Sequence, residues 1–291
     1  MKISIEEWSQ SAVKYFDGAG SVYCGFKMKF SIVTLSFNQA RFLEAAILSV
    51  LEQDYPDIEY IVIDPGSTDG SREIIERYRD RISKVIFEPD RGGADGMNKG
   101  FAAATGDVFG FINSDDVLLP GAISRVAKQL QAHPEADIIM GHEWIIDAEG
   151  RKLRKSYTDK FDRRTYAYNG GVIAQQSTFF RAALFRKTKG LDIRLSVHWD
   201  TELFLDLLEA SDKQLYVDDF FGAFRIHDES ITGGKKLEME SRAYMRARFE
   251  RIMGRPWRTS DYPVWFFYRV RKYVREPRAL IEWLRRGSNP A

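Results

Sequence analysis

The sequence predicts an α/β protein with a mainly parallel sheet that helices cover on both faces. Short runs of β-branched and apolar residues alternate with amphipathic helical patterns, and the turns between them are short. Parallel neighbouring strands need a crossover connection, which a helix supplies, so this alternation indicates a parallel sheet. The chain has 291 residues, of which 44% are hydrophobic and 29% are charged, which is enough for a substantial core.

The first half of the chain alternates most regularly. The run 30–36 is rich in β-branched residues and predicts a strand, and the helix after it repeats apolar residues at three- and four-residue steps until Tyr55-Pro56. The same patterns predict strands at 59–64, 84–88 and 107–113 and helices at 71–79 and 94–104. Ligands bind such sheets beyond the carboxyl ends of the strands, so the residues that follow each strand are the first functional candidates.

The second half is less regular. A helix is predicted at 120–132, after which the pattern loosens through the segments 137–140 and 144–146. A second helix is predicted at 199–209, and strands are predicted at 176–181, 214–217 and 220–226. From residue 235 onward the pattern is helical and is interrupted by Pro256, Pro263 and Pro277. We expect an N-terminal extension at 1–29, a central domain at 30–232 with halves at 30–118 and 119–232, and a helical C-terminal segment at 233–291.

Composition excludes several classes of protein. The single cysteine, Cys24, forms neither an internal disulfide nor a cysteine metal cluster. The N-terminus lacks an apolar run of signal-peptide length, and no stretch reaches the roughly 20 apolar residues of a membrane span. These features favour a cytoplasmic protein. Residues 241–291 hold 13 basic and 4 acidic residues, although the whole chain carries a net charge of only +1. This asymmetry predicts an anionic partner for the C-terminal segment.

The strongest local feature is an apolar strand that ends in two adjacent acids, Phe111-Ile-Asn-Ser-Asp-Asp-Val117. Adjacent carboxylates repel each other unless a cation or hydrogen-bond donors hold them. Oxygen ligands favour Mg²⁺ or Mn²⁺, which complete their shells with water and substrate phosphates. The pair therefore points to a phosphorylated ligand, with a simple turn or helix cap at Asp116 as the alternative.

Polar residues also follow the neighbouring strands. Asp64 follows the second strand, and Asp95, Asn98 and Lys99 follow the third. Each of them alone is as well explained by capping or by surface exposure. Together they share one edge of the sheet, where a nucleotide would lie.

Four segments in order resemble glycosyltransferase family 2: Ser31-Ile-Val-Thr-Leu-Ser-Phe-Asn38, Ile63-Asp-Pro-Gly-Ser-Thr-Asp-Gly70, Gly93-Ala-Asp-Gly-Met-Asn-Lys-Gly100 and Asn113-Ser-Asp-Asp116. The resemblance covers about 30–232. It implies a GT-A fold, with a nucleotide-sugar half at 30–118 and an acceptor half at 119–232. It also implies transfer of a sugar from a nucleotide diphosphate sugar to an acceptor hydroxyl, with inversion at the anomeric carbon.

The resemblance implies roles for individual residues on the donor side. Thr34, Asp64 and Asp95 would surround the base and ribose, with Asn38, Asn98 and Lys99 in the same nucleotide-sugar site. Asp115 would lie near the ribose and sugar, Asp116 would bind a Mn²⁺ or Mg²⁺ ion on the diphosphate, and His227 would approach that metal. Many members have two consecutive acids where this chain has Asp64-Pro65, so the preferred base is left open.

On the acceptor side, the resemblance places a general base at the start of the predicted helix 199–209, within the segment Ser196-Val-His-Trp-Asp200. Asp200 is the candidate, and its alternative is a first-turn acid favoured by the helix dipole, with Glu202 as the base. Gln175 and Gln176 would bind acceptor hydroxyls, with Trp199 beside them. A buried strand with satisfied amides is the alternative for the two glutamines.

The C-terminal segment interleaves aromatic and basic residues. Such helices lie on anionic membranes or dock on their own domain, and both interpretations stay open. A membrane position suits a lipid-linked saccharide acceptor, although a plain saccharide is also possible, and nucleic acid is not expected. A scaffold without catalysis remains an alternative function. A sugar nucleotidyltransferase fits less well, because Phe37-Asn38-Gln39 stands where its glycine-rich loop belongs.

Overall fold

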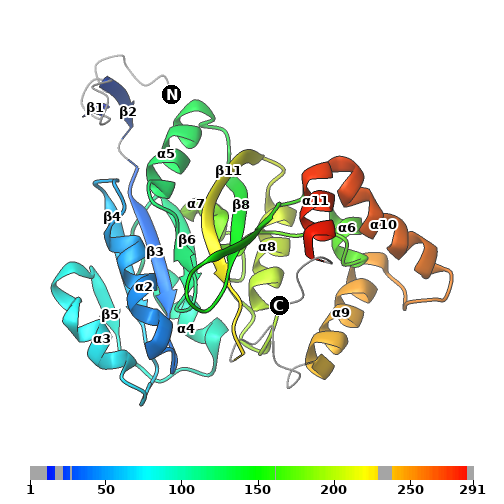
Figure 1. Cartoon of the computed structure of the whole chain (residues 1–291), viewed down its shortest axis with the longest axis horizontal. Helices are drawn as coiled ribbons and strands as arrows, with labels where there is room; N and C mark the ends of the chain where they lie inside the picture. The colour runs from blue at the N-terminus through cyan, green and yellow to red at the C-terminus, as the bar shows by residue number, and fades with distance from the viewer. Residues whose placement is uncertain (1–11, 17–21, 27, 161, 229–237, 287–291) are drawn as a thin grey trace.

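The computed structural model describes residues 12–16, 22–26, 28–160, 162–228 and 238–286. Its centre is a sheet with the strand order β5-β4-β3-β6-β10-β8-β11-β7, and β9 pairs with β8 (Figure 1). The first four strands in this order run parallel as predicted: β5 (Lys84–Ile86), β4 (Ile58–Ile63), β3 (Phe30–Leu35) and β6 (Val108–Asn113). Within the N-terminal extension, β1 (Ala12–Phe16) and β2 (Val22–Phe26) form a separate antiparallel pair.

Helices cover both faces of the sheet. Ile32 on β3 packs in one core with α2 (Ala40–Leu51), α3 (Ser71–Arg77) and α5 (Ala122–Ala132). Its neighbour Val33 packs in a second core with α4 (Gly93–Ala103), α7 (Ala182–Phe185) and α8 (Trp199–Ala210). Successive strand residues point to opposite faces, so a continuous apolar run is buried on both sides. This arrangement confirms the predicted α/β architecture.

The second half of the sheet is mixed. The segments 137–140 and 144–146, where the sequence pattern loosens, belong to one strand, β8 (Ile138–Ile146). The strands predicted at 214–217 and 220–226 form a single strand, β11 (Gln214–Arg225), with register shifts between Tyr216 and Gly222, so the prediction of two separate strands there was wrong. Strand β10 (Thr178–Arg181) runs antiparallel between β6 and β8, and the predicted start of this strand at Gln176 belongs instead to the 3₁₀ turn η2 (Gln175–Ser177).

Several short elements lie outside the predicted pattern. They are β7 (Val117–Leu118), β9 (Lys152–Ser156), α6 (Arg163–Ala167) and the 3₁₀ turn η1 (Arg79–Arg81). Strand β9 is charged and half exposed, so its own sequence does not predict a strand. The segment forms a strand because it pairs with β8.

The C-terminal segment is helical, as predicted. It consists of α9 (Glu238–Met253), α10 (Asp261–Arg275) and α11 (Pro277–Arg286), and Figure 1 shows these helices beside α6 and α8, at one end of the molecule. Tyr268 of α10 stacks on Tyr168, with ring centroids 5.2 Å apart, and Phe249 of α9 joins the same cluster. The segment is therefore packed against the domain through one aromatic core. In the described part of the chain, no helix is both long and apolar enough to cross a bilayer.

Candidate active site at the carboxyl edge of the sheet

The turn after β4 is organised by Asp64. Its carboxylate accepts hydrogen bonds from the backbone N–H groups of Gly66 (3.0 Å) and Ser67 (2.8 Å) and from Nε of Arg72 (3.0 Å). Burial alone would raise the pKa of Asp64, but these donors outweigh it and hold the pKa below its usual range. Asp64 is fully buried, so it stabilises the turn and is not itself exposed at the carboxyl edge of the sheet.

The turn after β3 is joined to this first turn by Asn38. Oδ1 of Asn38 accepts from the Thr68 N–H (2.9 Å), and the Asn38 N–H donates to Oγ of Ser67 (2.8 Å). Asn38 adopts a left-handed conformation, with φ of 51°, and it is exposed. It therefore fixes two strand ends and still faces solvent.

Thr34 was expected to contact the nucleotide. The structure places it inside the sheet, with no exposed surface, and its hydroxyl accepts from the Tyr60 hydroxyl at 3.0 Å. We correct the expectation for this residue, because a ligand at the edge cannot reach a side chain that is covered on all sides.

The adjacent acids after β6 have different surroundings. Asp116 is completely buried, and its Oδ2 accepts from the side-chain amides of Gln176 (2.5 Å) and Asn113 (3.3 Å), while its Oδ1 accepts from the Arg225 N–H (2.9 Å). Burial, together with the charge of Asp115, raises the pKa of Asp116 well above its usual range. Both carboxylate oxygens thus accept hydrogen bonds from the protein, and the side chain is buried, so Asp116, which was expected to bind the metal, is less accessible to an ion than Asp115.

Asp115 is the accessible member of the pair. Its side chain is 17% exposed, and Oδ2 lies 3.1 Å from Nε2 of His227, whose own side chain is 1% exposed. Nε of Arg225 donates to the backbone oxygen of Asp115 at 2.7 Å. A second guanidinium nitrogen of Arg225 reaches the carbonyls of Asp147 (3.1 Å) and Ala148 (3.0 Å). Arg225 therefore holds the turn, and His227 supports its carboxylate.

The surroundings of Asp115 fit a divalent cation held by a single carboxylate. No three His, Cys, Asp or Glu side chains gather as a metal-ligand set within the described residues. Mg²⁺ and Mn²⁺ ions that bind nucleotides accept few protein ligands and take the rest from water and phosphates. His227 packs on the Phe42 ring (4.3 Å), and its buried Nδ1 has no partner in the described part of the chain. The residues present thus suit a metal shared between Asp115 and a ligand.

The loop after β5 supplies further acids. Asp95, in the first turn of α4, accepts from the backbone N–H (3.0 Å) and a guanidinium nitrogen (3.1 Å) of Arg91, and these bonds lower its pKa. Asn98 bonds with both backbone groups of Leu191, and the Lys99 ammonium donates to the Pro89 carbonyl (2.5 Å). Asn98 and Lys99 therefore brace the loop, while Asp95 remains at the edge.

The start of α8 brings a further acid to this region. The Trp199 indole lies 6.0 Å from the Phe111 ring, and its Nε1 is 3.3 Å from where a Cβ on Gly93 would stand. Asp200 follows directly. Its Oδ1 accepts from the Thr201 N–H (2.7 Å), and its Oδ2 makes no hydrogen bond with the described residues. Burial raises the pKa of Asp200, as a proton acceptor near neutral pH requires.

Glu202 was the alternative base, but its surroundings differ. It accepts from the Tyr244 hydroxyl at 2.9 Å and is paired with Arg251, so it ties α8 to α9. His198, in a left-handed conformation with φ of 60°, stacks on Tyr244 and lies 2.7 Å from Oγ of Ser241 through Nε2. These contacts fix the first turn of α8 and leave Asp200 as the acid with a free oxygen.

Gln175 and Gln176 were expected to bind an acceptor, and the structure corrects this. Nε2 of Gln175 donates to the Phe111 carbonyl (2.5 Å), and its Oε1 accepts from Asn113 (3.4 Å). Nε2 of Gln176 donates to Asp116. Both side chains are buried and hydrogen-bonded, as the alternative interpretation expected, and they support the turn that carries Asp115 and Asp116.

Two residues of the site escaped sequence reasoning. Arg225 lies two residues before His227, and only the histidine was singled out from the sequence. Asp90 precedes the glycine pair before α4, and its Oδ2 is buried without a partner among the described residues. Burial raises the pKa of Asp90, and the charges of Asp95 and Asp64 add to this effect. Its place after β5 was the signal available in the sequence.

The chain is similar in sequence to known glycosyltransferases. The sequence model of glycosyl transferase family 2 matches residues 31–189. The chain is 39% identical over 135 residues to an uncharacterized glycosyltransferase of Nostoc sp., covering 45% of this chain and 41% of that relative. It is 30% identical over 211 residues to an uncharacterized glycosyltransferase of Haemophilus influenzae, covering 70% and 82%. A third relative is the GalNAc(5)-diNAcBac-PP-undecaprenol beta-1,3-glucosyltransferase of Campylobacter jejuni, with 28% identity over 220 residues, 71% of this chain and 68% of the relative.

Solved structures share the GT-A fold. S. aureus TarS in complex with UDP-GlcNAc superposes with a TM-score of 0.63 at 17% identity, covering 79% of this chain and 67% of that one. The mannosyltransferase PcManGT from Pyrobaculum calidifontis, in complex with GDP-Man and Mn²⁺, gives a TM-score of 0.60 at 14% identity, covering 91% and 77%. At these identities the likeness establishes the fold alone.

Proposed function

Because the chain belongs to glycosyltransferase family 2, we propose that it transfers a sugar from a nucleotide diphosphate sugar to an acceptor hydroxyl, with inversion at the anomeric carbon. One observation carries the proposal. Asp115 lies at the carboxyl edge, where it is partly exposed and His227 contacts its carboxylate. Asp200 has a raised pKa and an oxygen without a hydrogen bond in the described part of the chain, and it lies in the first turn of a helix that contacts the same edge through Trp199.

We assign the nucleoside to the loops after β3, β4 and β5. Asn38 is exposed there, and Asp90 and Asp95 offer carboxylate oxygens to ribose hydroxyls or base N–H groups. The unpartnered Oδ2 of Asp90 supports this assignment, because a buried oxygen without a donor is costly unless a ligand supplies one. Asp64 acts indirectly, by holding the turn beside them.

Asp115 would hold a divalent metal at the diphosphate, with His227 and Arg225 fixing the orientation of its turn. Such an ion, when bound, neutralises the charge that develops on the departing diphosphate. Asp116 serves as the buried support of this turn, through Gln176 and the Arg225 N–H.

Asp200 would act as the general base. As the acceptor oxygen bonds to the anomeric carbon, the bond from that carbon to the diphosphate oxygen breaks, and the acceptor proton passes to Oδ2 of Asp200. Attack from the face opposite the diphosphate inverts the configuration. The raised pKa of Asp200 improves its match to a proton that is released near neutral pH.

We further propose a membrane-bound acceptor and a peripheral membrane position. The C. jejuni relative is named for a substrate carried on PP-undecaprenol, which supports a lipid-linked saccharide. In α10, Tyr268 packs inward, while Phe266 and Val274 on the outer face are 63% and 75% exposed. Tyr262 and Val270 complete this stripe, which recurs every four residues.

The outer face continues on α11. Leu280, Ile281 and Leu284 are exposed there, and ten of the fifteen exposed large apolar side chains among the described residues lie on these two helices. Arg269 and Arg275 of α10 are exposed beside the stripe. An apolar stripe flanked by cations suits an anionic bilayer surface.

The test is transfer itself. The protein is incubated with UDP-, GDP- and TDP-sugars and Mn²⁺, with a saccharide linked to undecaprenyl diphosphate as the acceptor, and release of nucleoside diphosphate is followed. Acceptor-dependent release from one donor supports the proposal. Nucleotide binding without any release would favour the catalytically inactive scaffold instead.

A further inference from the structure

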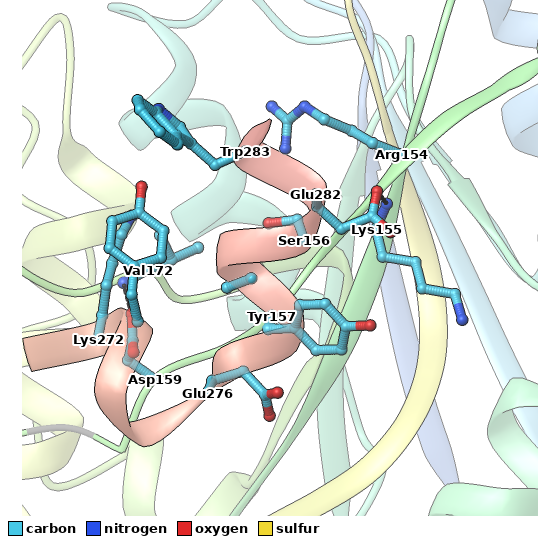
Figure 2. Close-up of a pocket in the computed structure, with 12 residues that line it drawn as sticks. Arg154, Lys155, Ser156, Tyr157, Asp159, Val172, Lys272, Glu276, Glu282 and Trp283 are labelled. Carbon is cyan, nitrogen blue, oxygen red and sulfur yellow. Dashed lines mark hydrogen bonds between the residues drawn. The ribbon is translucent and has the colours of Figure 1, made fainter. Parts of the chain in front are cut away.

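A cavity lies away from the carboxyl edge of the parallel strands. It has a volume of about 250 Å³. Strand β9 and the segment that follows it form one side, and the helices α10 and α11 form the other. Figure 2 shows Trp283 and Lys272 on the helical side and Lys155, Ser156 and Tyr157 on the strand side. None of the proposed donor-site residues lines this cavity.

Three of its lining side chains offer hydrogen-bond donors that the protein does not use. The Lys272 ammonium, the Tyr273 hydroxyl and Nε1 of Trp283 make no hydrogen bonds within the described residues. Lys272 lies 4.9 Å from the centre of the Tyr273 ring, and the Tyr273 and Trp283 ring centroids are 6.3 Å apart. The cavity thus combines aromatic surface with unused polar groups, which suits a ligand that is itself apolar on its faces and polar at its rim.

The charges that line the cavity balance, since Arg154, Lys155 and Lys272 stand against Asp159, Glu276 and Glu282, so the cavity has no excess of positive charge that would select a phosphate or a free carboxylate. Glu276 is paired with Arg278, and Glu282 accepts from the Lys155 N–H (3.3 Å) and from Arg285 (3.2 Å). Asp159 accepts from the Val172 N–H (2.9 Å) through Oδ2, and its Oδ1 has no hydrogen-bond partner in the described part of the chain. An anion would meet these carboxylates, whereas a neutral polyhydroxyl ligand can use both the donors and the free Asp159 oxygen.

We propose that this cavity binds one uncharged sugar residue of the acceptor glycan. A sugar ring presents C–H groups on its faces and hydroxyls around its edge, which matches Tyr273 and Trp283 as platforms and Lys272 and Asp159 as hydroxyl partners. The volume is slightly below the roughly 300 Å³ at which pockets for drug-sized ligands begin, so it suits a single ring. This inference rests on the proposed glycosyltransferase function.

The cavity is joined to the active site through a short stretch of backbone. Asp159 and Val172 exchange two hydrogen bonds, from the Asp159 N–H to the Val172 carbonyl and from the Val172 N–H to the Asp159 carboxylate, both 2.9 Å. Three residues after Val172 begins the turn of Gln175 and Gln176, which holds Asp116. A sugar bound here therefore lies on the acceptor half. It also lies against α11, whose outer face would meet the membrane that carries a lipid-linked glycan.

The experiment is saturation-transfer NMR on the full chain with the methyl β-glycosides of glucose, N-acetylglucosamine and N-acetylgalactosamine at millimolar concentration. We expect transfer to at least one glycoside. Trp283→Ala should weaken its binding about ten-fold, because it removes one aromatic platform. Leu153→Ala is the matched control, since Leu153 is exposed on β9 beside the cavity and does not line it, and it should bind as the unaltered protein does.

Three results would overturn the proposal. The first is the absence of transfer to all three glycosides, and the second is equal binding by the Trp283→Ala variant. The third is displacement of the glycoside by excess UDP or GDP, because it would place the glycoside in the donor site. A protein that binds the glycoside in this way, but releases no nucleotide from any donor, would retain the sugar site and lose the proposed transferase function.

Discussion

Replacing Asp200 with asparagine tests the proposed chemistry most sharply among single substitutions. Asparagine keeps the size of the side chain and an oxygen that can accept from the Thr201 N–H, so the first turn of α8 should remain intact. It removes the capacity of Oδ2 to take a proton. Transfer should therefore be lost, while donor binding persists.

The expected magnitude follows from general base catalysis. A positioned base contributes roughly 10²–10⁴-fold, which corresponds to about 3 to 5 kcal/mol of the barrier. Acceptor-dependent release of nucleoside diphosphate measures kcat, and thermal stabilisation by the donor measures binding. We expect kcat to fall within that range and the donor-induced stabilisation to stay the same.

Glu202→Gln provides the matched control, two residues away on the same helix. It weakens the tie to Arg251 and Tyr244, so it should lower stability and leave the kcat of the folded protein near that of the parent. If Asp200→Asn retained kcat within about ten-fold of the parent, or if Glu202→Gln lost turnover instead, the assignment of the base would be refuted.

Four further outcomes are expected. Burial raises the pKa of Asp200, and a general base works only when it is deprotonated, so turnover should be lost as the pH falls through that raised pKa. The acidic limb of the plot of kcat against pH should therefore lie above the usual aspartate pKa near 4, and a limb at or below pH 4 would contradict this. Asp115→Asn should weaken Mn²⁺-dependent donor binding about 10- to 100-fold, as measured by calorimetry, whereas an unchanged affinity would remove Asp115 from the metal. Asp116→Asn places an amide among three donors and should lower the free energy of unfolding by about 1–3 kcal/mol in urea titrations, whereas full stability with lost metal dependence would restore Asp116 as the ligand. Val274→Glu should reduce co-sedimentation with phosphatidylglycerol vesicles about ten-fold or more, with Ile193→Glu as an exposed control elsewhere, and equal binding by both variants would leave α10 without a membrane role.

The parallel half of the fold was predictable because its signals are local. The apolar runs at β3, β4 and β6 are buried on both faces, and each is followed by a short polar turn, which is rich in glycine and aspartate after β4 and in aspartate after β6. Polar residues in a buried strand defeat the same reasoning. Strand β8 carries His142 and Glu143, but His142 pairs with Asp218, and Glu143, whose pKa burial raises to about 7, is bonded by Ser156. Those partners lie elsewhere in the sequence, so the pattern of β8 alone does not reveal them.

The candidate site was predictable in place but not in detail. The sequence locates two acids after β6, but which of them points inward is decided by Gln176 and by Arg225, 60 and 109 residues away from Asp116. The same distant contacts turn the glutamines from expected acceptor ligands into buried supports. Thr34 was misassigned for a related reason, since the Tyr60 side chain on the neighbouring strand, 26 residues away, bonds to its hydroxyl inside the sheet.

The C-terminal segment shows a third kind of limit. Its composition indicates basic and aromatic helices, but not which aromatic rings pack inward. Tyr268 is buried against Tyr168, whereas Phe266, two residues earlier, is exposed on the opposite side of α10. Only the docking of the helix separates the core residues from the stripe proposed to meet a membrane.

The central claim is that the carboxyl edge of the sheet binds a nucleotide diphosphate sugar. Calorimetric titration of the full chain with UDP, GDP, TDP and their sugars, each with and without Mn²⁺, tests it directly. The account predicts Mn²⁺-dependent binding of one nucleotide and its sugar, which Asp115→Asn weakens and Asp200→Asn leaves unchanged. Absence of binding by every nucleotide, or binding that neither Mn²⁺ nor Asp115→Asn alters, would contradict it.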